Sequence, residues 1–151
     1  MYSILLPLHS LFRWIVLAFL LGGIFRAFIG FIKNRVFSKT DNIFRHWTAT
    51  VAHIQLLIGM VLYTQSPFVQ LFWNTKGSDK SSKDLFFFGV IHIGCMLLAI
   101  TLITIGSALA KRRDLDTDKF KTMLIWFSIA LIVIFMAIPW PFSPLSSRPL
   151  L

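Results

Sequence analysis

Hydrophobic residues dominate four long stretches of the chain, and polar residues gather between them. A helix needs about 20 predominantly apolar residues to cross the hydrocarbon core of a bilayer. All four stretches reach this length, and none shows the alternation of a membrane β-strand. They cover residues 8–31, 43–64, 85–110 and 121–139. The pattern predicts an all-α protein, an integral membrane four-helix bundle with up-down topology.

Prolines and polar segments mark the boundaries of these stretches. Pro7 suits the first turn of a helix, where its missing N–H does no harm, and Pro139 should end the last helix. The connection between the second and third stretches is the longest, and its aromatic first part is predicted to lie at the membrane interface. The Pro-rich tail, residues 140–151, should be extended. A chain of 151 residues is long enough for one domain, 1–151.

The composition supports a membrane location and explains the high positive charge. Hydrophobic residues make up 56% of the chain, above the roughly 45–50% of soluble proteins. The net charge is +9, but the charged residues lie between the apolar stretches. This placement predicts contact with the lipid bilayer and argues against nucleic acid as a partner.

The distribution of lysine and arginine predicts the orientation, because cytoplasmic loops are enriched in these residues. Nine flank the first and third connections: Lys33, Arg35, Lys39, Arg45, Lys111, Arg112, Arg113, Lys119 and Lys121. Four lie on the other side: Lys76, Lys80, Lys83 and Arg148. The side with nine should face the cytoplasm, which places both termini outside it.

The four histidines are the candidate functional residues, because all of them lie in or at the ends of predicted spans. They are His9, His46, His53 and His92. Ionisable residues inside a membrane are rare and mark functional sites by default. The chain has no glutamate, and its aspartates lie in loops or at span edges, which disfavours a carboxylate-bridged metal centre. Neutral imidazoles in an apolar bundle suit haem iron instead.

The depth of each histidine in the membrane indicates which of them could share one iron. At 1.5 Å per residue, His9 and His92 are closest in level, and His53 and His92 come next. The first and third helices of an up-down bundle are diagonal, which leaves room for a porphyrin between them. His9, His53 and His92 are therefore the axial candidates. His46 could meet a propionate or a quinone, or could ligate with Met123, although core packing suits Met123 better.

Two further observations bear on the cofactor. Arg13 lies one turn from His9 and could pair with a propionate or extend to the interface, and both alternatives stay open. Arg26 is expected to extend toward the cytoplasmic interface. His46 and His53 are only about 10.5 Å apart along the helix axis, which is close for two stacked haems. The sequence thus predicts one haem b and leaves a second open.

Three segments carry a resemblance to a known family: "LHSLFRWIVL", "RHWTATVAHIQLLIGMVLY" and "KTMLIWFSIALIVIFMAIPWPF". The chain resembles small bacterial four-helix membrane proteins described as cytochrome b-like. The resemblance extends over nearly the whole chain. It implies a b-type haem, electron transfer and the bacterial inner (plasma) membrane, with ligands among the four histidines.

These arguments predict a membrane cytochrome that carries single electrons, between quinol and a partner protein or other membrane subunits. No nucleophile or general base is arranged in the sequence, so an electron-transfer subunit is favoured over a self-contained enzyme. Two alternatives remain open. One is a structural subunit of a larger complex, whose histidines would only bond neighbouring helices. The other is a haem-handling enzyme or transporter, in which haem is the substrate.

Overall fold

The computed structural model describes residues 1–75 and 83–140, and these are almost entirely helical. The elements are α1 (Tyr2–Ile32), α2 (Lys39–Gln65), α3 (Pro67–Asn74), α4 (Lys83–Phe86), a π-helix (Phe87–Ile91), α5 (His92–Arg112) and α6 (Asp116–Ala137). The third predicted span therefore consists of α4, the π-helix and α5 in direct succession. Four helical segments are long and apolar enough to cross a membrane. The protein is an all-α, multi-pass four-helix bundle, as predicted.

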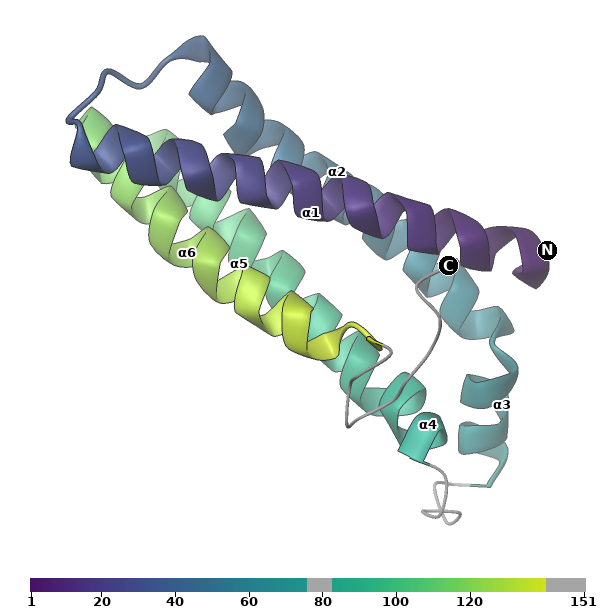
Figure 1. Ribbon diagram of the computed structural model, residues 1–151. Coiled ribbons are helices and arrows are strands. Elements are labelled where there is room, and N and C mark those ends of the chain that lie inside the picture. The colour runs from purple at the N-terminus through teal and green to yellow at the C-terminus, as the bar shows by residue number, and fades with distance from the viewer. Residues whose placement is uncertain (76–82, 141–151) are drawn as a thin grey trace.

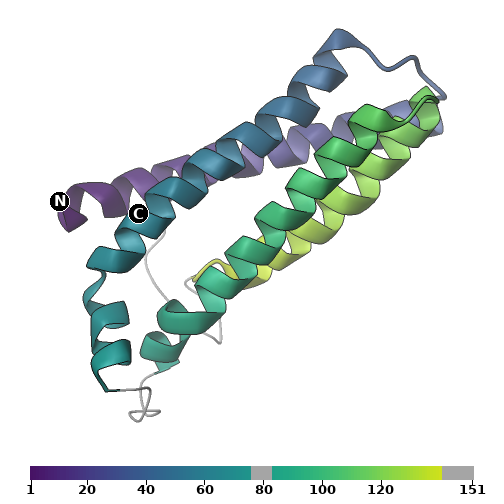
Figure 2. The same cartoon turned by 180° about the vertical axis from the view of Figure 1, so that it is seen from behind.

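The four long helices form a ring of neighbours (Figures 1 and 2). Helix α5 packs most extensively on α6, and α1 packs on both α2 and α6. Helices α2 and α5 have the smallest shared surface of the four neighbouring pairs, and α1 and α5 lie diagonally. This is the up-down arrangement in which residues from α1 and α5 can meet only across the middle of the bundle.

The two ends of the bundle differ in what they contain. At one end, residues 33–38 and 113–115 join α1 to α2 and α5 to α6; we name it the connection end. At the other end lie the start of α1, the short helices α3 and α4 and the end of α6 (Figure 1). We name this the pocket end, because the cavity described below lies there.

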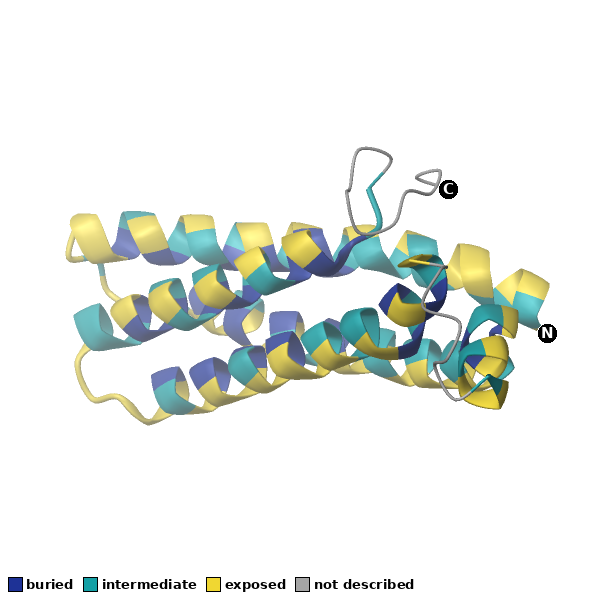
Figure 3. Ribbon diagram, turned by 90° about the horizontal axis from the view of Figure 1, so that it is seen from below, coloured by how far each residue is buried: buried dark blue, intermediate teal, exposed yellow. Residues whose placement is uncertain are grey.

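Large hydrophobic side chains occupy both the core and the outer surface of the bundle. Phe87, Phe120 and Phe127 are fully buried between the helices. Leu57 and Met136, in contrast, are exposed over about two-thirds of their surface (67% and 65%). Figure 3 shows exposed residues along the outer faces of the helices. In water such surfaces would be unfavourable, but they suit a lipid bilayer.

The helices extend further than the predicted spans at several ends. Helix α1 begins at Tyr2, so Pro7 lies inside it, and the expectation that Pro7 occupies the first turn is wrong. Its missing N–H removes one hydrogen bond, which membrane helices tolerate. Helix α6 begins at Asp116, five residues before the predicted 121. Hydropathy detects where a helix enters the hydrocarbon, whereas the helical hydrogen bonds continue into the polar region.

Other predicted boundaries can be compared directly. Helix α6 ends at Ala137, ahead of Pro139 as expected. The aromatic part of the long connection forms α3, with Pro67 in its first turn. Most of the polar part of this connection falls on residues 76–82, and the predicted extended tail, 140–151, falls on 141–151 except for Trp140. Both of these ranges lie outside the described residues.

A polar cluster fixes the connection end. The fully buried Asp41 carboxylate accepts hydrogen bonds from Arg26 Nε (2.8 Å) and Arg35 Nη2 (2.9 Å). It also accepts from the backbone N–H and the hydroxyl of Ser38, which completes a capping box at the start of α2. Arg26, expected to extend toward the interface, therefore ends in an ion pair that joins α1 to α2.

Candidate functional site

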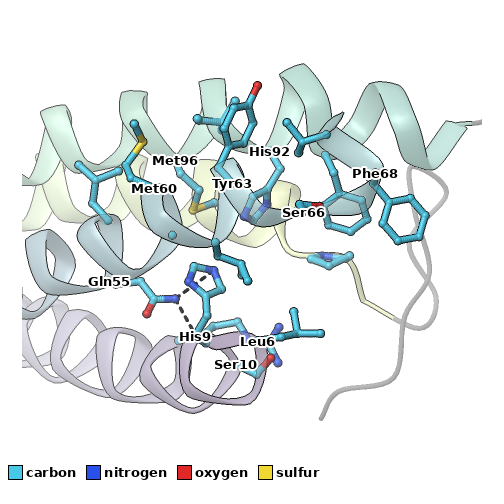
Figure 4. A pocket seen from close by; sticks show the side chains of 18 of the residues that line it. Leu6, His9, Ser10, Gln55, Met60, Tyr63, Ser66, Phe68, His92 and Met96 are labelled. Atoms are coloured by element: carbon cyan, nitrogen blue, oxygen red, sulfur yellow. Dashed lines mark hydrogen bonds between the residues drawn. The ribbon is translucent and has the colours of Figure 1, made fainter. Parts of the chain in front are cut away.

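A cavity of about 360 Å³ lies at the pocket end, within the range of roughly 300–1,000 Å³ of small-molecule and cofactor sites. Its wall comes from α1, α2, α3, the π-helix, α5 and the residues after α6. Most of the lining side chains are apolar, and His9, Gln55 and His92 are polar exceptions (Figure 4). An apolar cavity with a few convergent polar groups is the general form of a ligand site.

His9 and His92 face each other across this cavity. Their ring centroids are 6.3 Å apart, with an angle of 69° between the ring planes. His9 comes from α1 and His92 from the first turn of α5, the diagonal pair of helices. The sequence placed these two histidines closest in level, and the fold brings their rings together.

The π-helix before α5 surrounds His92 with aromatic rings. Phe87 and Phe88 both lie near its imidazole, with centroids 5.8 Å and 6.1 Å away. A π-helix has a wider turn than an α-helix and is frequent at functional sites. In this wider turn two consecutive phenylalanines can both approach the ring of His92.

A hydrogen-bonded chain connects this π-helix to α2 and α3. The hydroxyl of Tyr63 donates to the carbonyl oxygen of Gly89 (2.8 Å), and the indole N–H of Trp73 donates to the Tyr63 hydroxyl (3.0 Å). Gly89 packs closely against Phe72, whose ring would lie 2.7 Å from a β-carbon at this position. Helix α3 is thereby held against the turn that precedes His92.

The hydrogen bond of His92 fixes the position of its proton. Its Nδ1 lies 2.8 Å from the carbonyl oxygen of Ala137, at the end of α6. A carbonyl oxygen can only accept, so Nδ1 carries the proton. In the neutral ring Nε2 then has the lone pair that a metal ion would bind. A backbone carbonyl in this role is common for metal-ligating histidines.

His9 is held by Gln55 from α2. The amide nitrogen of Gln55 donates to the carbonyl oxygen of His9 (2.9 Å) and lies 3.3 Å from His9 Nε2. Two buried polar atoms of this pair, His9 Nδ1 and Gln55 Oε1, have no hydrogen-bond partner within residues 1–75 and 83–140. Unpaired buried polar atoms are rare in proteins and require an explanation.

The structure places the other candidate residues differently. Arg13 lines the cavity, with its guanidinium 5.4 Å from the ring centre of Trp14. His46 and His53 are exposed on the outer face of α2 and line no part of this cavity. His53 donates from Nδ1 to the Ala49 carbonyl (2.7 Å) and approaches the Thr104 hydroxyl (3.4 Å).

Met123 is fully buried in the core, which confirms the prediction that it packs there.

Two residues of the site, Gln55 and Tyr63, were not predicted from the sequence. Gln55 gave a signal, because a polar amide inside an apolar helix requires a partner. Tyr63 gave none, since a tyrosine near a span end is ordinary in membrane proteins.

No group of three or more His, Cys, Asp or Glu side chains is placed to hold a metal ion within residues 1–75 and 83–140. The cavity instead offers two imidazoles, a residue type that could hold haem iron. No family model, curated protein or solved structure matches this chain. The case for a function therefore depends on the geometry of the cavity.

Proposed function

We propose that this protein is a membrane b-type cytochrome that carries single electrons, with one haem held between His9 and His92. The observation that carries the proposal is the 6.3 Å separation of the two ring centroids. Imidazole nitrogens lie about 2.0–2.1 Å from a bound zinc ion, so two histidines that hold one metal ion must have their rings close together. The separation of the two rings fits a shared metal ion.

The surroundings of the two rings also fit this cofactor. The proton of His92 is on Nδ1, which leaves the lone pair of Nε2 for iron. Apolar residues such as Met96, Ile100 and Phe88 line the rest of the cavity and suit a porphyrin. Arg13, also in the lining, could form charge-assisted hydrogen bonds with a propionate.

A bound haem supplies one-electron redox chemistry. The residues of this chain would set its potential through two-histidine ligation, apolar burial and the nearby guanidinium of Arg13. We further propose that the protein passes electrons between quinol and a partner protein in a bacterial inner membrane. In this assignment the basic connection end faces the cytoplasm and the haem lies nearer the outer surface.

The first experiment is a reduced-minus-oxidised absorption spectrum of the detergent-purified protein, with haem quantified per chain. The wild type should show a b-type spectrum and one haem. His9→Ala and His92→Ala should lose it, whereas the exposed His46→Ala and His53→Ala serve as matched controls and should keep it. A colourless protein, purified intact from haem-replete cells, would overturn the proposal.

A second candidate function is a structural subunit of a larger membrane complex. The interhelical hydrogen bonds of the histidine side chains favour it, because His9 Nε2 accepts from Gln55 of α2 and His92 Nδ1 donates to Ala137 of α6. Such bonds contribute about 0.6 kcal/mol on average between membrane helices. This candidate predicts that His9→Ala lowers stability slightly and that the wild type binds no haem, so the same spectra separate the two functions.

A further inference from the structure

Gln55 makes contacts at the cavity that bear on how His9 could bind a metal ion. Its amide nitrogen donates to the backbone carbonyl oxygen of His9 at 2.9 Å. Since a carbonyl oxygen only accepts, this bond fixes which end of the amide is the nitrogen. The orientation of the Gln55 side chain is therefore determined, and Figure 4 shows both contacts as dashed lines.

The same amide nitrogen determines the tautomer of the His9 ring. It lies 3.3 Å from His9 Nε2, and because an amide nitrogen can only donate, Nε2 must be the accepting nitrogen. The ring proton is then on Nδ1. His92 has its proton on Nδ1 as well, through the Ala137 carbonyl. Both rings are thus in the tautomer with the lone pair on Nε2.

The two unpaired atoms of this pair complement each other chemically. His9 Nδ1 is a donor in this tautomer, and Gln55 Oε1 is an acceptor. Both are buried, and neither has a hydrogen-bond partner in the part of the chain that the structure describes. When a metal ion takes the lone pair of Nε2, the Gln55 amide loses that contact, and its oxygen can accept the Nδ1 proton if ring and amide turn toward each other. Metal-ligating histidines usually donate their second ring N–H to such an acceptor.

We infer that Gln55 is a positioning residue for His9. It holds the ring in the Nδ1–H tautomer before the cofactor binds, and it supplies the acceptor for that proton afterwards. The part of this inference that concerns a bound metal rests on the proposed function. The part that concerns the tautomer does not, because it follows from hydrogen bonds of the chain itself.

The test uses full-length, ¹⁵N-histidine-labelled protein in nanodiscs, prepared free of haem, since protonated and unprotonated ring nitrogens have distinct ¹⁵N chemical shifts. The variant is Gln55→Met, which keeps the side-chain volume and removes the amide, and Gln55→Leu repeats the test with a branched side chain. Gln65→Met, on the same helix and outside the cavity lining, is the matched control. His9→Ala assigns the His9 signals.

In the wild type we expect His9 protonated at Nδ1. In both Gln55 variants His9 should change to a mixture of tautomers, while His92 and the Gln65→Met control stay unchanged. Haem titrated into the same samples should bind about 10–100-fold more weakly to the Gln55 variants. An unchanged His9 tautomer in Gln55→Met and Gln55→Leu would overturn the inference, even if the wild type binds haem.

The result also separates this inference from the proposed function. If the tautomer depends on Gln55 but wild-type protein binds no haem, the positioning of His9 by Gln55 is supported, and its role toward a metal ion is overturned together with the cytochrome assignment. If haem binds with the same affinity to wild type and to both Gln55 variants, the cytochrome assignment stands and the role of Gln55 toward the metal is overturned.

Discussion

The connection end and the pocket end of the bundle both contain buried polar side chains, but they treat them differently. At the connection end, the Asp41 carboxylate accepts four hydrogen bonds from Arg26, Arg35 and Ser38, and Arg35 Nε is the unpaired atom among the described residues there. At the pocket end, His9 Nδ1 and Gln55 Oε1 are unpaired beside a cavity. The first arrangement joins helices, whereas the second has room and hydrogen-bonding capacity for a ligand.

The difference shows how two functions of buried polar groups can be told apart. A charge in a low-dielectric region must be paired, and the ion pairs of Asp41 fill that need within the chain. The imidazoles of His9 and His92 instead line a largely apolar cavity with their lone pairs on Nε2, and that of His9 accepts from the Gln55 amide.

Replacing Asp41 should produce the largest change in stability. Asp41→Asn removes the charge that Arg26 and Arg35 pair with. We expect the free energy of unfolding to fall by about 3 kcal/mol. This value is at the low end for a broken buried ion pair, because both guanidiniums are partly exposed. Unfolding in mixed detergent measures it. The exposed Asp114→Asn is the control. Haem content per folded chain should not change; a parallel loss of haem would contradict the separation of the two ends.

Haem itself should stabilise the wild type. A ligand at 100 times its dissociation constant adds about 2.7 kcal/mol to the unfolding free energy. The gain should appear in the wild type and in Asp41→Asn and be absent from His92→Ala. Thermal unfolding with and without added haem measures it. A gain of the same size in His92→Ala would show that haem binds elsewhere.

Gly30 tests close packing at the connection end. A β-carbon there would lie about 2.5 Å from ring atoms of the fully buried Phe120. Gly30→Ala should therefore cost about 2 kcal/mol, a typical cost of overpacking a core. Gly94→Ala is the matched control, because no atom of the described residues lies within 4 Å of its added carbon. Equal unfolding free energies for the two variants would refute this packing argument.

Tyr63 gives the smallest expected effect, at the pocket end. Tyr63→Phe removes the hydrogen bond to the Gly89 carbonyl, a loss of about 1 kcal/mol. It should also shift the haem absorption spectrum or midpoint potential, because the π-helix before His92 is less constrained. Tyr2→Phe removes the other tyrosine hydroxyl of the cavity lining and therefore controls for the loss of a hydroxyl there. A spectrum identical to wild type would limit Tyr63 to a structural role.

The sequence alone determined the four spans, the similar depth of His9 and His92, and the end of α6. Hydropathy located four spans. A backbone in lipid must satisfy its own hydrogen bonds, and an apolar segment of this length does so by forming a helix. The spacing along these helices placed His9 and His92 at similar depth, and the up-down connections placed their helices diagonally. The end of α6 was also predictable, because Pro139 disfavours helical backbone in the residue before it.

Only the tertiary structure decided the rest. Periodicity could not separate His9 and His92 from His46 and His53, because nearly all faces of these helices are apolar and the pattern does not show which one turns inward. Packing places His53 on the outer surface of the bundle. Gln55, two residues further along α2, points into the bundle and bonds to His9. The π-helix before His92 and the ion pair of Arg26 with Asp41 likewise depend on contacts between segments far apart in the chain, which no local pattern records.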